Sequence, residues 1–366
     1  MRPLSVFGGL LVACVTGVTL AGGGAGLAAA SASGPWSAKP LPQYGNQNGH
    51  EPVPASGRAV STKHPNHVIG HGTPGSCTSA AVVQAVAKGG IIVFNCGPRP
   101  VTITMNATAK LENTSHRVVI DGGGKVTLSG AGKRQILYLN TCDPKQHFTT
   151  TNCFNQQWPK LIVQNITFKD GNSQVRQTKT SFYGGGALFD EGGQLKVVNT
   201  GFIDNRCFHV GPDLGGAAIR ALAQWKGLPV YITSDTFRGG RCSNGSALSS
   251  IGVSWIVLNS LMINNHAIGF GANPAAGGTK GGGSGGAIYT DGDKYSLTVG
   301  GTIIRSNFAR EGGSAIFFVS NDNTGTLTIK DSTLHANPNG KFWTPPYVGI
   351  YFHSSGHPKV IHSTIN

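Results

Sequence analysis

Four charged residues in the second half of the chain, Glu191, Asp213, Arg220 and Asp291, are the candidates for catalysis. Asp and Glu together number only 15, so each carboxylate can be considered singly. A glycoside hydrolase needs two carboxyl groups roughly 5 to 10 Å apart. A polysaccharide lyase needs a cation that neutralises a uronate and a base that removes a proton. Both reactions fit these residue types, and for each acid a turn cap or a salt bridge is the structural alternative.

A second set of residues could bind a sugar chain. Alternate residues of a strand point to opposite faces, and the outward positions near the charged residues are rich in aromatic side chains. Such a stripe could be a platform for sugar rings. Alternatively, long loops fold over it and bury its aromatics as a separate small core. The expected substrate-binding residues are Phe189, Tyr289, Phe317, Tyr351 and His353.

Both sets lie within an internal repeat. One pattern, apolar-x-apolar-x-polar-x-x-apolar, alternates with a second, in which two small residues, the second usually Ala, precede an aliphatic residue. The second pattern includes Gly186, Ala217, Ser246, Gly286, Ser314 and Val348 as its first residues. The first pattern covers residues 161–168, 195–202, 230–237, 255–262, 297–304, 327–334 and 358–365.

Each repeat has the alternation of half-buried strands. One coil cannot bury its apolar face alone, whereas coils stacked about 4.8 Å apart bury continuous aliphatic ladders. The sequence therefore predicts an all-β solenoid, a parallel β-helix of about ten coils, over residues 73–366. Residues 78–88 predict a short helix that caps its N-terminal end, with Thr78 as N-cap and Gly89 as terminator.

The stacking decides which carboxylates can cooperate. Glu191 and Asp291 lie three coils apart, about 14 Å, which is too far for hydrolysis. Asp213 lies in the loop before the next coil, so Glu191 with Asp213 is the expected pair. In an elimination, Arg220 would neutralise the uronate, and the base would be His209, Tyr289 or Lys226.

The connections between strands carry two further signals. Asn165, Asn199 and Asn259 are at matched turn positions, where they could form a hydrogen-bonded ladder or simply tolerate left-handed backbone angles. The loop 269–286 is the richest in Gly and could act as a mobile lid.

The repeats resemble those of a known family. Gly-Gly-Ala-Ile at 285–288, with Phe-x-x-Asn at 202–205, is similar to the repeats of polymorphic outer-membrane-protein passengers. The wider resemblance, over residues 73–366, is to right-handed parallel β-helices of the pectin-lyase-like superfamily, whose early coils Val119–Gly124 also resembles. It implies a right-handed solenoid. That superfamily contains lyases, hydrolases, fructan-processing enzymes and non-catalytic adhesins, and no catalytic signature of a single enzyme family matches.

The amino-acid composition excludes some classes of protein and indicates the charge of the partner. The 55 Gly among 366 residues show no G-X-Y period, which excludes collagen, and argue against a helical bundle. Lys and Arg exceed Asp and Glu by 29 to 15, a net charge of +14 that favours an anionic partner. No nucleic-acid recognition motif is present.

The first residues predict export. Residues 1–32 have the apolar run and the Ala-Ser-Ala site of a signal peptide, with lipidation at Cys14 as the less favoured alternative. No later segment is apolar enough to span a membrane. Residues 33–72 predict a disordered linker. The remaining six cysteines are expected to form disulfides between sequence neighbours: Cys77 with Cys96, Cys142 with Cys153, and Cys207 with Cys242.

Two hypotheses follow. The first is a secreted carbohydrate-active protein, a polysaccharide lyase or a glycoside hydrolase, that acts on an anionic polysaccharide. The second is a non-catalytic cell-surface or matrix-binding β-helix protein of the adhesin kind. Either would be a monomer that binds no nucleic acid and has no membrane span. No metal-ligand spacing is present and no cofactor is expected, with Ca²⁺ left open.

Overall fold

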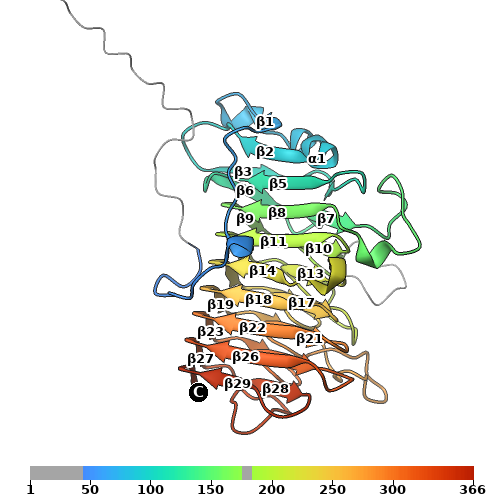
Figure 1. Ribbon diagram of the computed structural model, residues 1–366, viewed down its shortest axis with the longest axis vertical. Helices are drawn as coiled ribbons and strands as arrows, with labels where there is room; N and C mark the ends of the chain where they lie inside the picture. The colour runs from blue at the N-terminus through green and yellow to red at the C-terminus, as the bar shows by residue number, and fades with distance from the viewer. Residues whose placement is uncertain (1–43, 175–183) are drawn as a thin grey trace, which may run out of the picture. The chain divides into compact units, whose positions relative to one another are not determined.

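The computed structural model describes residues 44–174 and 184–366. In these ranges the chain forms a parallel β-helix built from four sheets (Figure 1). The predicted all-β solenoid is confirmed, and the ten strands of the largest sheet agree with about ten coils. The expected signal peptide, 1–32, lies outside the described residues.

Sheets A and B form two faces of the coil. Sheet A has ten strands: β1 (His67–Ile69), β2 (Gly90–Phe94), β5 (Arg117–Asp121), β8 (Lys160–Gln164), β11 (Gln194–Val198), β14 (Val230–Thr233), β18 (Trp255–Leu258), β22 (Ser296–Gly300), β26 (Thr326–Lys330) and β29 (Lys359–Ile361). Sheet B has nine: β3 (Val101–Thr104), β6 (Val126–Ser129), β9 (Thr167–Lys169), β12 (Gly201–Ile203), β15 (Thr236–Arg238), β19 (Leu261–Ile263), β23 (Ile303–Arg305), β27 (Thr333–His335) and β30 (Thr364–Ile365).

Sheets C and D complete the coil. Sheet C has eight strands: β4 (Ala109–Lys110), β7 (Leu137–Asn140), β10 (Leu188–Glu191), β13 (Ile219–Ala221), β17 (Leu248–Ile251), β21 (Ile288–Asp291), β25 (Ile316–Val319) and β28 (Ile350–His353). Sheet D has three: β16 (Arg241–Cys242), β20 (His266–Ala267) and β24 (Phe308–Ala309). Short 3-10 turns lie at Ala55–Gly57, Pro74–Ser76, Cys153–Asn155 and Trp225–Gly227.

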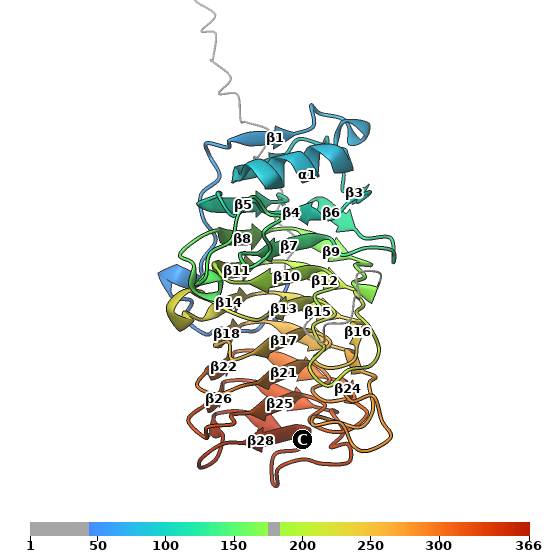
Figure 2. The ribbon, with the colours of Figure 1, turned by 90° about the vertical axis from the view of Figure 1, so that its right-hand side faces the viewer.

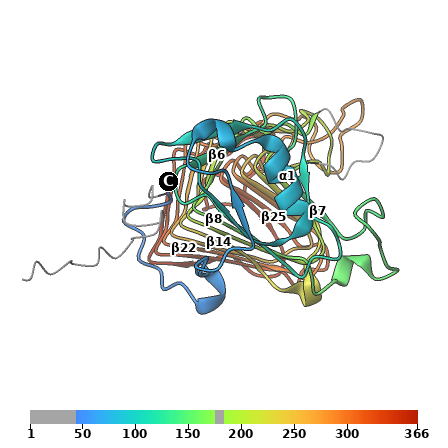
Figure 3. The same cartoon turned by 90° about the horizontal axis from the view of Figure 1, so that it is seen from above.

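The single α-helix of the described residues, α1 (Ser79–Lys88), closes the N-terminal end of the stack. The Thr78 side chain accepts a hydrogen bond from the first turn, and Gly89 ends the helix with φ of +75°, as predicted. Val82 and Val86 are buried in the same core as the strands. Viewed along the stack, α1 lies over the coils (Figure 3). The helix therefore removes from water an apolar end that the first coil would expose.

Residues 44–66, here called the strap, do not form the disordered linker that their composition predicts. The strap lies on the outside of sheet A, with Glu51 paired to Lys330 on β26 at 2.6 Å. Farther along, Gln164 on β8 exchanges two hydrogen bonds with the Val60 backbone. The partners come from several coils, so composition alone does not disclose them. The β-helix also begins earlier than residue 73, because β1 pairs with β2.

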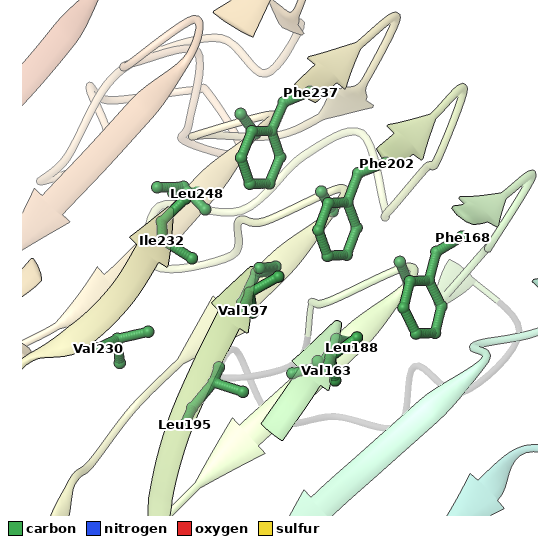
Figure 4. Close-up of a cluster of buried hydrophobic side chains, with 14 of the residues drawn as sticks. Val163, Phe168, Leu188, Leu195, Val197, Phe202, Val230, Ile232, Phe237 and Leu248 are labelled. Carbon is green, nitrogen blue, oxygen red and sulfur yellow. The ribbon is translucent and has the colours of Figure 1, made fainter. Parts of the chain in front are cut away.

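The core is a set of side-chain ladders, one rung per coil. Phe168, Phe202 and Phe237 stack with ring centroids 5.4 and 4.9 Å apart (Figure 4). Met262 and Ile304 continue the same column in register. Because equivalent residues lie directly above one another, a ring on one coil packs best against a ring on the next.

A ladder of asparagines runs inside the corner that follows sheet B. Asn265 donates from its backbone N–H and its Nδ2 to Asn307 Oδ1, at 3.0 and 2.9 Å. Asn307 makes the same two bonds to Asn337 Oδ1, both at 3.0 Å. These side chains are almost wholly buried, so each amide satisfies backbone groups that a tight corner would otherwise leave without partners.

Two of the turn asparagines fulfil both predicted roles, and the third has only the left-handed backbone angle. Asn165, Asn199 and Asn259 have φ of 52°, 47° and 51°. Asn199 Nδ2 donates to Asn165 Oδ1 at 2.9 Å. Asn259 instead binds the strap: its Oδ1 accepts from the Glu51 N–H and its Nδ2 donates to the Glu51 carbonyl, both at 2.9 Å.

Three disulfides join the cysteines as predicted, Cys77–Cys96, Cys142–Cys153 and Cys207–Cys242. Their presence indicates an extracellular or otherwise oxidising environment. Within the described residues, no helix has the length and apolarity to cross a bilayer.

The strap generates a test. Asn259→Ala removes two hydrogen bonds to Glu51, and we expect the free energy of unfolding to fall by about 1–3 kcal/mol more than in Asn264→Ala. Asn264 is exposed and has φ of 56°, so the control carries the same left-handed backbone cost. Urea denaturation of the full chain measures both. Equal losses would show that Asn259 does not hold the strap.

Candidate functional site

The strands of sheet C lie one above another (Figure 2), and their register places the predicted site residues of this sheet in two columns. In the second column Asp291 and His353 each pair with an apolar residue, Ile251 and Val319, and lie two coils apart. The first column pairs one residue from each coil, in the register that the sequence predicts: Phe189, Arg220, Ser249, Tyr289, Phe317 and Tyr351.

The first column points outward but is not an open platform. Phe189, Arg220, Tyr289 and Phe317 are at most 3 % exposed, although they lie outside the central core. Loop 208–216 contacts Arg220, loop 269–283 contacts Tyr289 and loop 338–349 contacts Phe317. Of the two predicted alternatives, the structure therefore has the one in which loops cover the stripe. Only Tyr351, half-buried, and His353, exposed, remain accessible among the expected sugar-binding residues.

Arg220 corrects a specific expectation. The sequence predicts an outward guanidinium that could neutralise a uronate, yet Arg220 is 0 % exposed. Its Nη1 donates to Ser249 Oγ at 2.5 Å and its Nη2 donates to the Asp213 carbonyl oxygen. A group enclosed in this way cannot reach a substrate carboxylate. Its charge acts instead on the carboxylates around it.

An asparagine joins two of the candidate carboxylates, Asp213 and Asp291. Asn273 Nδ2 contacts Asp213 Oδ1 at 2.9 Å and Asp291 Oδ2 at 3.0 Å. The two oxygens are consequently no more than about 6 Å apart, a separation within the range for glycoside hydrolysis. Tyr289 OH also lies 3.0 Å from the same nitrogen and donates to Asp291 Oδ2 at 3.1 Å. The close pair is thus Asp213 with Asp291.

Burial and charge set the protonation of this cluster. Burial lowers the pKa of Arg220 to about 10, against the opposing effect of Tyr289 and the carboxylates. Burial raises the pKa of Asp213; Arg220 opposes this rise and the charge of Asp291 adds to it. Burial also raises the pKa of Tyr289 well above its usual range. Tyr289 is therefore a neutral donor, and Asp213 is the carboxyl of the pair that burial favours in its protonated form.

Glu191 lies at the edge of the same charge cluster. Burial raises its pKa, while the Asn140 side chain and the Arg220 charge lower it. Its neighbour Asp190 is fully buried, and its Oδ2 accepts a 2.5 Å hydrogen bond from Gln224 Nε2. No hydrogen bond joins Glu191 to Asp213 among the described residues. The pairing of these two acids for hydrolysis stays a prediction.

A cleft of about 460 Å³ opens beside the cluster. Its floor includes Asp291, Val319 and His353 of the second column. Three aromatic residues line it, Phe317 on β25, Tyr351 on β28 and Phe342 in the loop before β28. None of the lining residues is Lys or Arg, and the others come from two further loops: Ala272, Asn273, Pro274 and Asn321. The combination of ring faces with one carboxylate and one imidazole suits a polar ligand with apolar ring surfaces.

Sequence reasoning missed three residues of this face. Asn273 and Phe342 come from loops between repeats, where no periodic pattern predicts direction. Asn273 did carry a signal, because it is the one amide side chain in the Gly-rich loop that the sequence suggests as a lid. Tyr138 stacks on Phe189 at 5.4 Å, one coil before the predicted stripe begins. Its alternation, Leu-Tyr-Leu-Asn, could have revealed it.

Neither a protein-family model, nor a curated protein, nor a solved structure matches this chain. Within residues 44–174 and 184–366, no cluster of three His, Cys, Asp or Glu side chains could hold a metal ion.

Burial of Arg220 generates a stability test. Arg220→Met leaves Ser249 and three carboxylates without their cation, and we expect a loss of about 3–5 kcal/mol in the free energy of unfolding. Arg117→Met, at an exposed position on β5, should change it by less than about 0.5 kcal/mol. Chemical denaturation measures both. An Arg220→Met variant with the same free energy of unfolding as wild type would contradict the enclosed position of Arg220.

Asp190 generates a pH test. Burial raises its pKa well above the usual value, and the charge of Glu191 adds to the rise. A carboxyl group whose pKa is higher in the folded than in the unfolded protein favours folding while it is protonated. This contribution is complete below the pKa of the unfolded state and is lost as the pH rises through the pKa of the folded state. Asp190→Asn has no proton to lose. Its stability relative to wild type should therefore increase above about pH 4, by at most about 1.4 kcal/mol per pH unit.

The control for this test is Asp293→Asn, which removes the same charge at an exposed position. Its stability relative to wild type should stay nearly constant across the same pH series. A flat profile for Asp190→Asn as well would mean that the buried carboxyl is ionised at little cost.

Proposed function

We propose that this protein is a secreted carbohydrate-active protein whose cleft on sheet C binds a polysaccharide and hydrolyses a glycosidic bond. The observation that carries the proposal is the pair Asp213 and Asp291, joined through Asn273, at the edge of an aromatic-walled cleft. Secretion is supported by the predicted signal peptide and by the three disulfides. The predicted resemblance to the pectin-lyase-like superfamily supports a glycan substrate.

Hydrolysis fits these residues better than β-elimination does. Elimination needs an accessible cation beside the uronate, and Arg220 is enclosed by Ser249 and the loop of Asp213. Hydrolysis needs two carboxyl groups in different protonation states. Asp213, whose pKa burial raises, would be the general acid.

Asp291 would be the nucleophile. Its oxygens accept hydrogen bonds from Tyr289 OH, the Gly292 N–H, Asn273 Nδ2 and Asn321 Nδ2. These four donors fix the orientation of the carboxylate. The oxygen separation of at most about 6 Å is shorter than the spacing of hydrolases that invert configuration, so the proposed reaction retains it.

Asn273 decides whether the pair can act. Its amide lies between the two carboxylates, so a glycosidic bond can enter only if the loop 269–283 moves the amide aside. The cleft next to Asn273 gives a sugar ring a place against Phe317 and Tyr351 before that movement. This arrangement assigns recognition to the aromatic walls and chemistry to the acids behind Asn273.

The second candidate function is glycan binding without catalysis, of the adhesin kind. The bridging position of Asn273 favours it, because in this conformation the amide satisfies both carboxylates as a structural cluster would. The two functions share the cleft and differ only in turnover.

A panel of neutral and uronate-containing polysaccharides, scored for new reducing ends and for unsaturated products, tests the proposal. Wild type should release reducing ends without unsaturated product. Asp291→Asn should lower that activity at least about 100-fold and leave binding in place. Asp293→Asn, two residues away and exposed, is the matched control and should retain activity.

Three results would overturn hydrolysis. Unsaturated product would establish elimination. If Asp291→Asn were as active as wild type, Asp213 and Asp291 would not be the catalytic pair. Binding that Tyr351→Ala weakens, with no product from any polysaccharide, would establish the second candidate.

A further inference from the structure

Six basic side chains line the corner between sheets B and D, away from the cleft. We call Lys169, Arg206, Arg238, Arg241, His266 and Arg305 the basic ridge. They come from five consecutive coils, those of β9, β12, β15, β19 and β23, so that every coil supplies at least one. Five of them are exposed and His266 is half-buried.

The strand register arranges the ridge in two parallel columns. Lys169, Arg238 and Arg305 share one column, separated by Ile203 and Ile263, and so recur at every second coil. In the other column Arg206 pairs with Arg241, and Arg241 pairs with His266, on successive coils. At about 4.8 Å per coil, the five coils span about 19 Å.

Few carboxylates of the described residues form ion pairs with these basic side chains. Among the described residues, Lys169 is the one ridge member with an ion pair, to Asp170 at 3.7 Å, while the four arginines form none. Asp170 and the half-buried Asp204 are the acids at this corner. Like charges paired across neighbouring strands destabilise a sheet. The stacked Arg206 and Arg241 therefore cost folding free energy that no ion pair of the described residues offsets. Burial lowers the pKa of His266, and the charge of Arg241 lowers it further, so this imidazole adds a polar face to the column.

An exposed aromatic ring continues the second column. Phe308 pairs with His266 in register, their ring centroids 6.0 Å apart, and Phe308 is 43 % exposed. An exposed ring in line with cations offers an apolar face as well as charge. A sugar ring that carries an acidic group uses both, because its C–H face packs on the aromatic ring and its charge pairs with arginine.

We infer that the basic ridge binds a linear acidic polysaccharide, laid parallel to the axis of the stack. The inference rests on the proposed function for the class of polymer, and it assigns the anionic part of that polymer to a surface other than the cleft. The cleft has no Lys or Arg in its lining, so it offers no charge partner for a polyanion. The repeated spacing of the ridge matches a polymer whose charges also recur at a fixed interval.

The test uses fluorescently labelled oligogalacturonates of increasing length, with binding followed by fluorescence anisotropy at two salt concentrations. Affinity should rise with length until the oligomer spans about 19 Å and then level off. R206Q/R241Q and R238Q/R305Q should each weaken binding about tenfold or more, with a smaller salt dependence. Phe308→Ala should weaken binding by a similar factor at both salt concentrations.

The matched control is R99Q/R117Q, which removes two exposed arginines from other parts of the β-helix and changes the net charge equally. It should bind like wild type. All the variants change exposed residues, so their thermal midpoints should equal or exceed that of wild type, which separates lost binding from lost folding.

Two results would overturn the inference. If R99Q/R117Q weakens binding as much as the ridge variants, the attraction is diffuse net charge. If duplex DNA or anionic lipid vesicles compete as well as oligogalacturonate and Phe308→Ala has no effect, the ridge binds polyanions of any kind. Hydrolysis is tested separately, through Asp291→Asn. If the ridge variants bind normally, the inference about the ridge is wrong but the proposed function is not affected. If the protein has no hydrolytic activity, the proposed function is wrong but the inference about the ridge is not affected.

Discussion

In-register stacking of parallel coils is the constraint on which the rest of the structure depends. Each coil is hydrogen-bonded to the next along sheets A, B and C, so a given position in one coil lies directly above the same position in its neighbour. Equivalent residues of successive coils therefore form columns. The phenylalanines of the core, the asparagines of the corner and the outward residues of sheet C are all columns of this kind.

The same stacking gives the outward faces different roles. A column on sheet C that loops cover becomes a second, polar core, in which Arg220 is enclosed among carboxylates and Tyr289. A column at the corner of sheets B and D that no described loop covers keeps its arginines in water. The fold therefore separates a desolvated charge cluster, where electrostatic effects are strong, from a solvated ridge, where they are screened.

Long-range contacts hold these faces in place. The strap binds turns and strands from many coils, from Asp121 on β5 to Lys330 on β26. Asn273 reaches Asp213 across 60 residues of sequence. Neither contact follows a repeat, and both connect coils that stacking alone would leave independent. Cross-links of this kind oppose the local opening to which repeat structures are prone.

By itself the sequence determined the coil, its register and the disulfide pairs. Alternation of apolar and polar residues predicts which side of a strand is buried. Repeats of nearly constant length predict which residues of successive coils align. Phe189, Arg220 and Tyr289 could therefore be placed in one column from the amino-acid pattern alone. Only the tertiary structure decided what covers that column. The loops around Asp213, Asn273 and Phe342 have no periodicity, and their direction depends on partners far away in the sequence. For the same reason composition could not show that residues 44–66 bind the sheet: the groups that bind them, such as Asn259 and Lys330, come together only when the coils stack.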